Sequence, residues 1–177
     1  MSPEGSGGGP RLPDSPGGSP RVRLRDMVTD VKRFEVRWSD LDMNRHMRNT
    51  AYSEYCIDVR VSFLQEHGFP VVEFGRRGLG PVIAREETQY MREIGAGETF
   101  EIDFQLAGFA PDGSRWRVQH EVRRGDGKRS AIVRIDGVWL DLARRRPVPP
   151  PPELYEAFQQ LERTDDFEEL RPVRREG

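Results

Sequence analysis

Residues 37–52 read RWSDLDMNRHMRNTAY, from Arg37 to Tyr52, and the rest of the folded chain can be placed outward from this stretch. A run of alternating apolar and polar residues leads into it, and an amphipathic segment follows it. Between them lie two aspartates, Asp40 and Asp42, on a linker without a long apolar run. The peptide N–H groups at a helix N-terminus can stabilise negative charge that develops beside a carboxylate. This arrangement indicates chemistry more than packing.

The segments on either side of the linker have the periodicities of a strand and a helix. Phe34, Val36 and Trp38 share one face at period two, which predicts a half-buried strand. Over residues 49–67 the apolar side chains recur at helical spacing and predict one long helix, with Asn49 or Thr50 as its N-cap. The apolar stripe consists of Tyr52, Tyr55, Cys56, Val59, Phe63 and Leu64.

After the helix, the pattern predicts a glycine-bearing connection and then four strands in meander order. The connection covers residues 71–79, and the strands cover 81–91, 99–107, 115–123 and 129–142, with turns at 111–113 and 125–127. The apolar residues of the last strand change phase at Asp136-Gly137, which predicts a β-bulge there. A Pro-rich stop then precedes a short helix at 153–161.

These elements predict one α+β domain, with an antiparallel sheet of about five strands packed on one long helix. We expect residues 1–30 to be a disordered Gly/Pro-rich tail, 31–162 to be the folded domain, and 163–177 to be a charged tail. One helix cannot cover both faces of such a sheet. The other face, or an edge, therefore needs a partner chain, so we expect a homo-oligomer.

Composition argues against several classes of function. The 28 Lys+Arg and 30 Asp+Glu nearly balance, which disfavours a nucleic-acid binder. No segment approaches the ~18–20 apolar residues of a membrane span, and no signal peptide is recognisable. The single cysteine, Cys56, excludes an internal disulfide and fits the reducing cytoplasm. The scattered His46, His67 and His120 have no metal-ligand spacing, so we expect no metal.

The two linker aspartates each have a catalytic and a structural interpretation. Asp42 can act as a nucleophile or as a general base on water, or it can form an Asx turn that fixes the helix entry. For Asp40 the structural role is favoured. His46 is interpreted as a hydrogen-bonded structural group, and Cys56 as a small core residue. The chain has no Gly-x-Ser-x-Gly elbow, which disfavours a serine hydrolase.

Residues 40–52 resemble the signature of the hotdog-fold acyl-CoA thioesterases of the 4-hydroxybenzoyl-CoA thioesterase type, roughly Asp-x-Asp-x-x-Gly-His-Val-Asn-Asn-x-x-Tyr. Beyond the first Asp, the residues that match this pattern are Asp42, His46, Asn49 and Tyr52, and Arg60 matches an arginine further along the helix. Arg45 replaces the glycine of the pattern, and Arg48 replaces its first asparagine. Because glycine permits positive φ, Arg45 implies a different loop path or a guanidinium at the mouth of the site.

This resemblance implies a hotdog domain, in which the sheet wraps around the central helix, and hydrolysis of an acyl-CoA or acyl-carrier thioester. Asp42 would be the catalytic carboxylate, and the backbone N–H of Asn49 would be the oxyanion donor. His46 and Tyr52 would contact substrate, and coenzyme A would be part of the substrate rather than a cofactor. The acyl pocket would lie at a dimer interface and include Pro81, Val82 and Ile83. Candidate cations for the phosphates are Arg92, Arg123, Arg124, Lys128 and Arg129.

Two other functions stay open within the same fold. Hydratase-type hotdog proteins have the motif Asp-x-Asn-Pro-x-His, and Asp42-Met43-Asn44 begins that way, but the proline is absent and His46 comes one residue too early. A third hypothesis is a hotdog protein that binds acyl groups without catalysis. The acyl group and the choice between dimer and tetramer are open as well.

Overall fold

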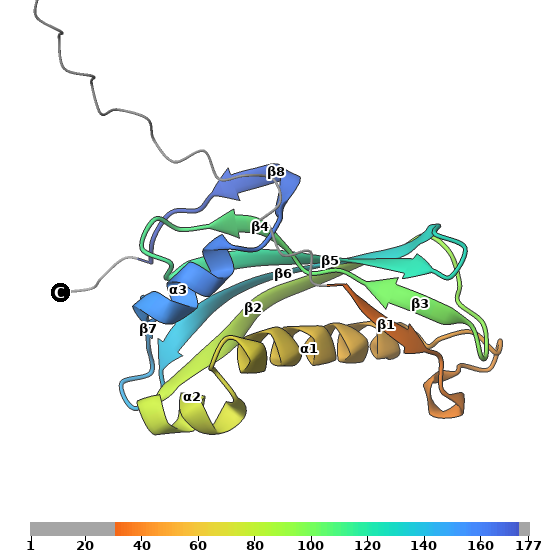
Figure 1. Cartoon of the computed structure of the whole chain (residues 1–177), viewed down its shortest axis with the longest axis horizontal. Helices are drawn as coiled ribbons and strands as arrows, with labels where there is room; N and C mark the ends of the chain where they lie inside the picture. Colours follow the sequence, from red (N-terminus) through yellow and green to blue (C-terminus); the bar gives the residue numbers. More distant parts are fainter. Residues whose placement is uncertain (1–30, 174–177) are drawn as a thin grey trace, which may run out of the picture.

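One eight-stranded sheet and three α-helices make up the computed structural model, which describes residues 31–173 (Figure 1). The strands are β1 Lys32–Glu35, β2 Leu79–Tyr90, β3 Thr99–Ile102, β4 Gln105–Phe109, β5 Arg115–Arg124, β6 Arg129–Asp141, β7 Arg146–Val148 and β8 Arg163–Glu169. The helices are α1 Asn49–Glu66, α2 Val71–Arg77 and α3 Pro152–Gln159, with a 3-10 helix, η1, at Trp38–Asp40.

The strand pairings place the eight strands side by side in five positions: β2, β6, β5 with β7, β3 with β4, and β1 with β8. The β4–β8 pair is parallel and the other pairs are antiparallel. The prediction of about five strands packed on one long helix is therefore wrong in number, although the short helix predicted at 153–161 is present as α3. The predicted strand at 99–107 divides at Asp103, where the side-chain Oδ1 accepts the N–H of Glu121 at 2.6 Å. β3 and β4 then pair with different parts of β5.

Helix α1 lies across the sheet and buries the predicted stripe, apart from half-buried Leu64 (Figure 1). Its N-cap is Arg48, with no capping side chain, so the expected cap by Asn49 or Thr50 is wrong. The buried residues of α1 are Ala51, Tyr52, Tyr55, Cys56, Val59 and Phe63. Burial raises the pKa of the Cys56 thiol to about 12, in agreement with a core residue rather than a nucleophile.

The segment predicted as a connection at 71–79 contains helix α2 instead. Pro70 is its N-cap, and Glu73 pairs with Arg76 and Arg77 one turn later. Phe74 packs its ring on Trp139 at 6.2 Å, so tertiary burial stabilises a helix of seven residues. So short a helix shows little of the periodicity from which helices are predicted.

The predicted change of phase in the last strand is wrong. Side chains at odd positions of β6 stay buried through Trp139, and Gly137 occupies the inward position between them. The Trp116 ring lies over Gly137, so a missing side chain, not a bulge, explains the gap in the apolar pattern. The register shift opposite Asp136 and Gly137 lies in the neighbouring strand β2, at Ala84, whereas the shift of β6 against β5 lies between Arg129 and Ala131.

The two faces of the sheet differ in polarity. Aromatic side chains of α1 and α3 meet on one face, where Phe63 and Phe158 lie 5.7 Å apart. On the other strand face Arg117 pairs with Asp136 at 2.5 Å, and Arg134 pairs with an aspartate of β8 at 2.9 Å. This charged face needs no apolar cover. The edge strand β2, exposed over most of its length, is the place where a partner chain remains predicted.

The segment predicted to begin a charged tail at residue 163 forms strand β8, which extends the sheet beside β4. The tail predicted at residues 1–30 lies outside the described residues. Within 31–173, no helix has the length and apolar character that crossing a membrane requires.

Candidate functional site

Asp42 closes the loop that leads into α1. Its Oδ1 accepts the backbone N–H groups of Asn44 at 2.8 Å and His46 at 3.1 Å, and its own N–H donates to the His46 carbonyl at 2.8 Å. Asp42 is exposed, and no group among residues 31–173 donates to its Oδ2. The structural and catalytic interpretations are therefore compatible, because they use different oxygens of one carboxylate.

Arg45 has a backbone conformation that glycine adopts more readily than other residues. Its φ is 64°, in the left-handed region, which costs a non-glycine residue on the order of 1 kcal/mol. Its side chain is exposed. The loop thus takes a glycine-like path with an arginine side chain on it. The positive φ shows that Arg45 adopts a conformation that favours glycine, so the substitution by itself requires no different loop path.

Asp40, by contrast, is buried beneath the linker. Its carboxylate accepts the Tyr55 hydroxyl at 2.6 Å and Arg37 Nε at 2.9 Å, while its carbonyl accepts the N–H of Arg48 at 2.7 Å. Burial alone would raise the pKa of Asp40, but the hydrogen bonds from Tyr55 and Arg37 outweigh it and lower the pKa. With both oxygens engaged, Asp40 supports the fold of the loop.

The N-terminus of α1 has free donors beside this loop. The first backbone bond at this end runs from the N–H of Ala51 to the carbonyl of Arg48 at 3.0 Å. The N–H groups of Asn49 and Thr50 have no acceptor in the described part of the chain. Both residues are exposed, and the helix dipole places partial positive charge here. These two donors can bind an anion or an oxygen on which negative charge develops.

The other residues predicted near this helix end are brought together there. The half-buried His46 forms an isolated bridge with Gly95. The Tyr52 ring packs edge-on against Tyr90 at 5.2 Å, and the Tyr90 hydroxyl donates to the carbonyl of Asn49 at 3.2 Å. Buried Tyr52 lies in the wall of the core, with its hydroxyl 3.3 Å from Ser130 Oγ.

Arg92 lies beyond the end of β2, beside the start of β6. Its Nη1 donates to the carbonyl of Arg129 at 2.9 Å, and its own carbonyl accepts the Ser130 hydroxyl at 2.5 Å. The side chain is exposed, so its guanidinium is accessible at this end of the molecule. Two of the other predicted phosphate-binding cations are already paired with a carboxylate. Arg123 and Arg129 both form ion pairs with Glu121, at 2.6 Å and 2.7 Å.

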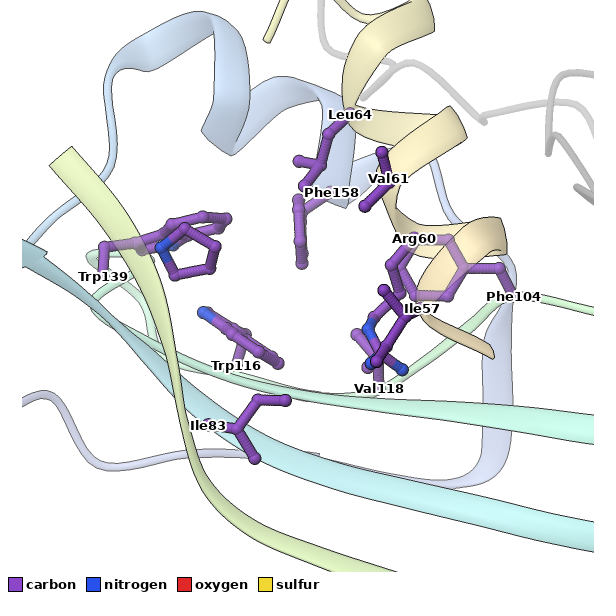
Figure 2. Close-up of a pocket in the computed structure, with 11 residues that line it drawn as sticks. Ile57, Arg60, Val61, Leu64, Ile83, Phe104, Trp116, Val118, Trp139 and Phe158 are labelled. Carbon is purple, nitrogen blue, oxygen red and sulfur yellow. The ribbon is translucent and has the colours of Figure 1, made fainter. Parts of the chain in front are cut away.

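A largely apolar pocket of about 260 Å³ lies further along α1 (Figure 2). At 1.5 Å per residue, its α1 residues are about 12 to 22 Å from Asn49 along the helix axis. Pro81 and Ile83 line this pocket within a single chain, whereas Val82, the residue between them, does not. The remaining lining residues are Ile57, Arg60, Val61, Leu64, Phe104, Trp116, Val118, Trp139 and Phe158.

The sequence interpretation missed the pairing of Arg60 with His120. Arg60 Nη1 lies 3.1 Å from Nε2 of the fully buried His120, whose Nδ1 lies 2.7 Å from the Asp103 carbonyl. A carbonyl only accepts, so Nδ1 donates to it and Nε2 accepts from Arg60, which defines a neutral imidazole. One sequence signal could have identified Arg60. It lies four residues after Cys56 and four before Leu64, and this spacing places a charged residue on the apolar side of the helix.

His120 is expected to stay neutral far below the ordinary range of histidine. Burial, and then the charge of Arg60, lower its pKa to about 3. Because the folded pKa is below the unfolded one, the free energy of unfolding is not reduced by this group above pH ~6.5. As the pH falls toward 3, the unfolded chain binds a proton that the folded chain does not, and the free energy of unfolding decreases, by about 3 kcal/mol at pH 4. Nitrogen NMR shifts of the imidazole over this range measure it, and protonation near pH 6.5 would contradict the pairing.

No group of three or more His, Cys, Asp or Glu residues within the described range is close enough together to hold a metal ion.

The comparisons with known proteins identify a family and a fold. A family model of the thioesterase-like superfamily matches residues 36–158, which includes the linker, α1 and the pocket. The comparison with curated proteins gave no match.

Solved structures share the fold at low sequence identity. A hypothetical protein from Staphylococcus aureus in complex with CoA is 18% identical, with a TM-score of 0.70 over 78% of this chain and 89% of that one. A 1,4-dihydroxy-2-naphthoyl-CoA thioesterase from Synechocystis is 13% identical, with a TM-score of 0.68 over 75% of this chain and 96% of that one. A DHNA-CoA thioesterase from Staphylococcus aureus is 14% identical, with a TM-score of 0.67 over 76% and 91%. These likenesses confirm a hotdog-like fold.

Proposed function

Because the chain belongs to the thioesterase-like superfamily, we propose that it hydrolyses the thioester of an acyl-coenzyme A to a free acid and a thiol. The observation that supports this function is the uncapped N-terminus of α1, whose free N–H groups follow a loop that carries the exposed carboxylate of Asp42. The neighbours named as CoA-bound or as CoA thioesterases favour coenzyme A as the thiol. Coenzyme A is then a substrate group, and no cofactor is proposed.

In this mechanism the thioester carbonyl oxygen accepts the N–H of Asn49, and the positive end of the helix stabilises the charge that grows on that oxygen. Asp42, held by its Oδ1, uses Oδ2 either to attack the carbonyl carbon, which gives a mixed anhydride, or to take a proton from an attacking water. The thiolate leaves without a strong general acid, because a thiol has a pKa near ~8.5.

Substrate contacts follow from the same geometry. Arg92 is proposed to bind a phosphate of coenzyme A, because its guanidinium is exposed near the helix end. His46 and Tyr52 are proposed to flank the thioester, and Pro81 and Ile83 to contact the acyl group. The exposed strand β2 supports pairing with a second copy of the chain, which would place part of each site at an interface.

The test of this function is thiol release from a panel of acyl-CoA esters with the full chain. The panel contains aliphatic esters of several lengths together with 4-hydroxybenzoyl-CoA and 1,4-dihydroxy-2-naphthoyl-CoA. At least one ester is expected to be hydrolysed with kcat/KM above about 10⁴ M⁻¹s⁻¹, as for ordinary enzymes. Absence of hydrolysis across the panel overturns the proposal for CoA esters. In a separate absorbance assay with an enoyl-CoA, loss of the conjugated double bond would indicate the hydratase function instead.

A further inference from the structure

Arg60 is the one charged side chain that lines the apolar pocket. Figure 2 shows it emerging from α1 beside Ile57, across the pocket from Trp139 in this view. Nearly all of the other lining side chains are aliphatic or aromatic. A charged group in such surroundings is costly unless an ion or a set of hydrogen bonds compensates it. The charge of the Arg60 guanidinium therefore needs a compensating group.

Within residues 31–173, no carboxylate lies within 4.0 Å of the Arg60 guanidinium. The acid that interacts with it at longer range is Glu86, which is exposed and accepts the hydroxyl of Ser53. The one hydrogen-bond partner of Arg60 in the described chain is His120, which is neutral. A guanidinium has five N–H donors, so most of those of Arg60 are available to a ligand.

His120 fixes the direction of this guanidinium. The imidazole is fully buried, held through Nδ1 by the Asp103 carbonyl at 2.7 Å, and stacked on Phe104 at 5.0 Å. Its Nε2 can only accept, so it binds one edge of Arg60 and leaves the others directed elsewhere. A neutral partner orients the cation without neutralising it. This is how a preorganised anion site is built, whereas a structural arginine is normally paired with a carboxylate.

The position of the pocket limits which anion fits it. Arg60 is eleven residues beyond Asn49, or about 16 Å along the helix axis. The volume of about 260 Å³ and the apolar walls suit a hydrocarbon chain better than the phosphates and ribose of coenzyme A. A thioester with its carbonyl at the helix start would extend its acyl chain toward Arg60.

We propose that the pocket binds an acyl chain that ends in a second carboxylate, which pairs with Arg60, while His120 is a positioning residue for that arginine. The substrate class is then the mono-CoA thioester of a dicarboxylic acid. This inference rests on the proposed function for the placement of the thioester, and it adds what lies at the other end of the chain. A methyl-ended chain of equal length leaves the guanidinium buried and unpaired, so the pocket discriminates against it.

The experiment measures binding and hydrolysis separately. Calorimetry on Asp42→Asn compares adipoyl-, suberoyl- and dodecanedioyl-CoA with hexanoyl-, octanoyl- and dodecanoyl-CoA, and with CoA alone. At the best length, the carboxyl-ended ester is expected to bind at least about tenfold more tightly than its methyl-ended partner, as a charged hydrogen bond allows. Arg60→Met, which keeps the length of the side chain, is expected to abolish that preference, and Arg60→Lys to retain part of it. Arg76→Met, at an exposed position of helix α2 that does not line the pocket, is the matched control.

The outcomes distinguish the inference about the acyl chain from the proposed thioesterase function. Tighter binding of the methyl-ended esters by the wild-type pocket, binding of neither series, or an unchanged preference in a folded Arg60→Met overturns the inference. Weaker binding of CoA alone to Arg60→Met shows that the guanidinium binds a phosphate, which also overturns it. Preferential binding of the carboxyl-ended ester without hydrolysis by the wild type supports the inference while the proposed function fails. If Arg60→Met does not fold, the preference of the wild-type pocket between the two series decides alone.

Discussion

Asp42→Asn is expected to lower kcat for thioester hydrolysis by about 10²- to 10⁴-fold, while the fold and the oligomeric state stay unchanged. The substitution is conservative for the loop, because the amide oxygen of asparagine can still accept the N–H groups of Asn44 and His46. It removes the negative charge and the second carboxylate oxygen, on which attack or proton transfer depends. Thiol release at saturating substrate, sampled at fixed times, measures kcat for the variant and the wild type.

Asp40→Asn is the matched control, since it changes the neighbouring acid in the same way. Asp40 is buried and bonded to Tyr55 and Arg37, so its loss is expected to lower stability by about 1–3 kcal/mol. Its kcat per folded molecule is expected to remain close to that of the wild type. If Asp42→Asn hydrolyses esters as fast as the wild type, or if Asp40→Asn reproduces its kinetic loss without unfolding, then Asp42 is not the catalytic acid.

Gly137→Ala is expected to destabilise the protein by about 3 kcal/mol or more. A Cβ added at Gly137 would lie 2.1 Å from the Trp116 ring, far inside van der Waals contact. That ring is confined by Trp139 at 5.8 Å and Phe158 at 6.2 Å between ring centroids, so it has little room to move. Because Trp116 also lines the pocket, acyl binding should weaken together with stability. Urea unfolding of the wild type and the variant measures the change.

Gly75→Ala is the control for the same chemical change. Gly75 is exposed in helix α2, and a Cβ there meets no atom within 4 Å. Alanine is favoured over glycine inside a helix, so this variant is expected to gain about 0.5–1 kcal/mol. An equal stability for Gly137→Ala and the wild type would show that Trp116 can move aside, and would contradict the packing described for β6.

Local patterns in the sequence were sufficient to predict helix α1, the turns at 111–113 and 125–127, and most of the strand positions. Each depends on contacts near in the sequence: an apolar stripe at helical spacing, or a Pro-Asp-Gly or Gly-Asp-Gly turn between alternating residues. The linker motif also pointed to thioesterases, and the match over residues 36–158 confirms this at the level of the thioesterase-like superfamily. The same local reading failed for α2 and β8, because a seven-residue helix and a charged edge strand are stabilised by distant partners.

The sequence by itself was enough to predict the apolar stripe of α1 and the loop around Asp42. Both features depend on residues that are neighbours along the chain. Only the tertiary structure decided the rest. It buried Asp40 under Tyr55 and left Asp42 exposed, although the two acids are equivalent by spacing. It also brought His120 from β5 to Arg60 on α1, a pair sixty residues apart. The physical reason is that burial and long-range hydrogen bonds are set by how the helix lies on the sheet, and no local pattern encodes that.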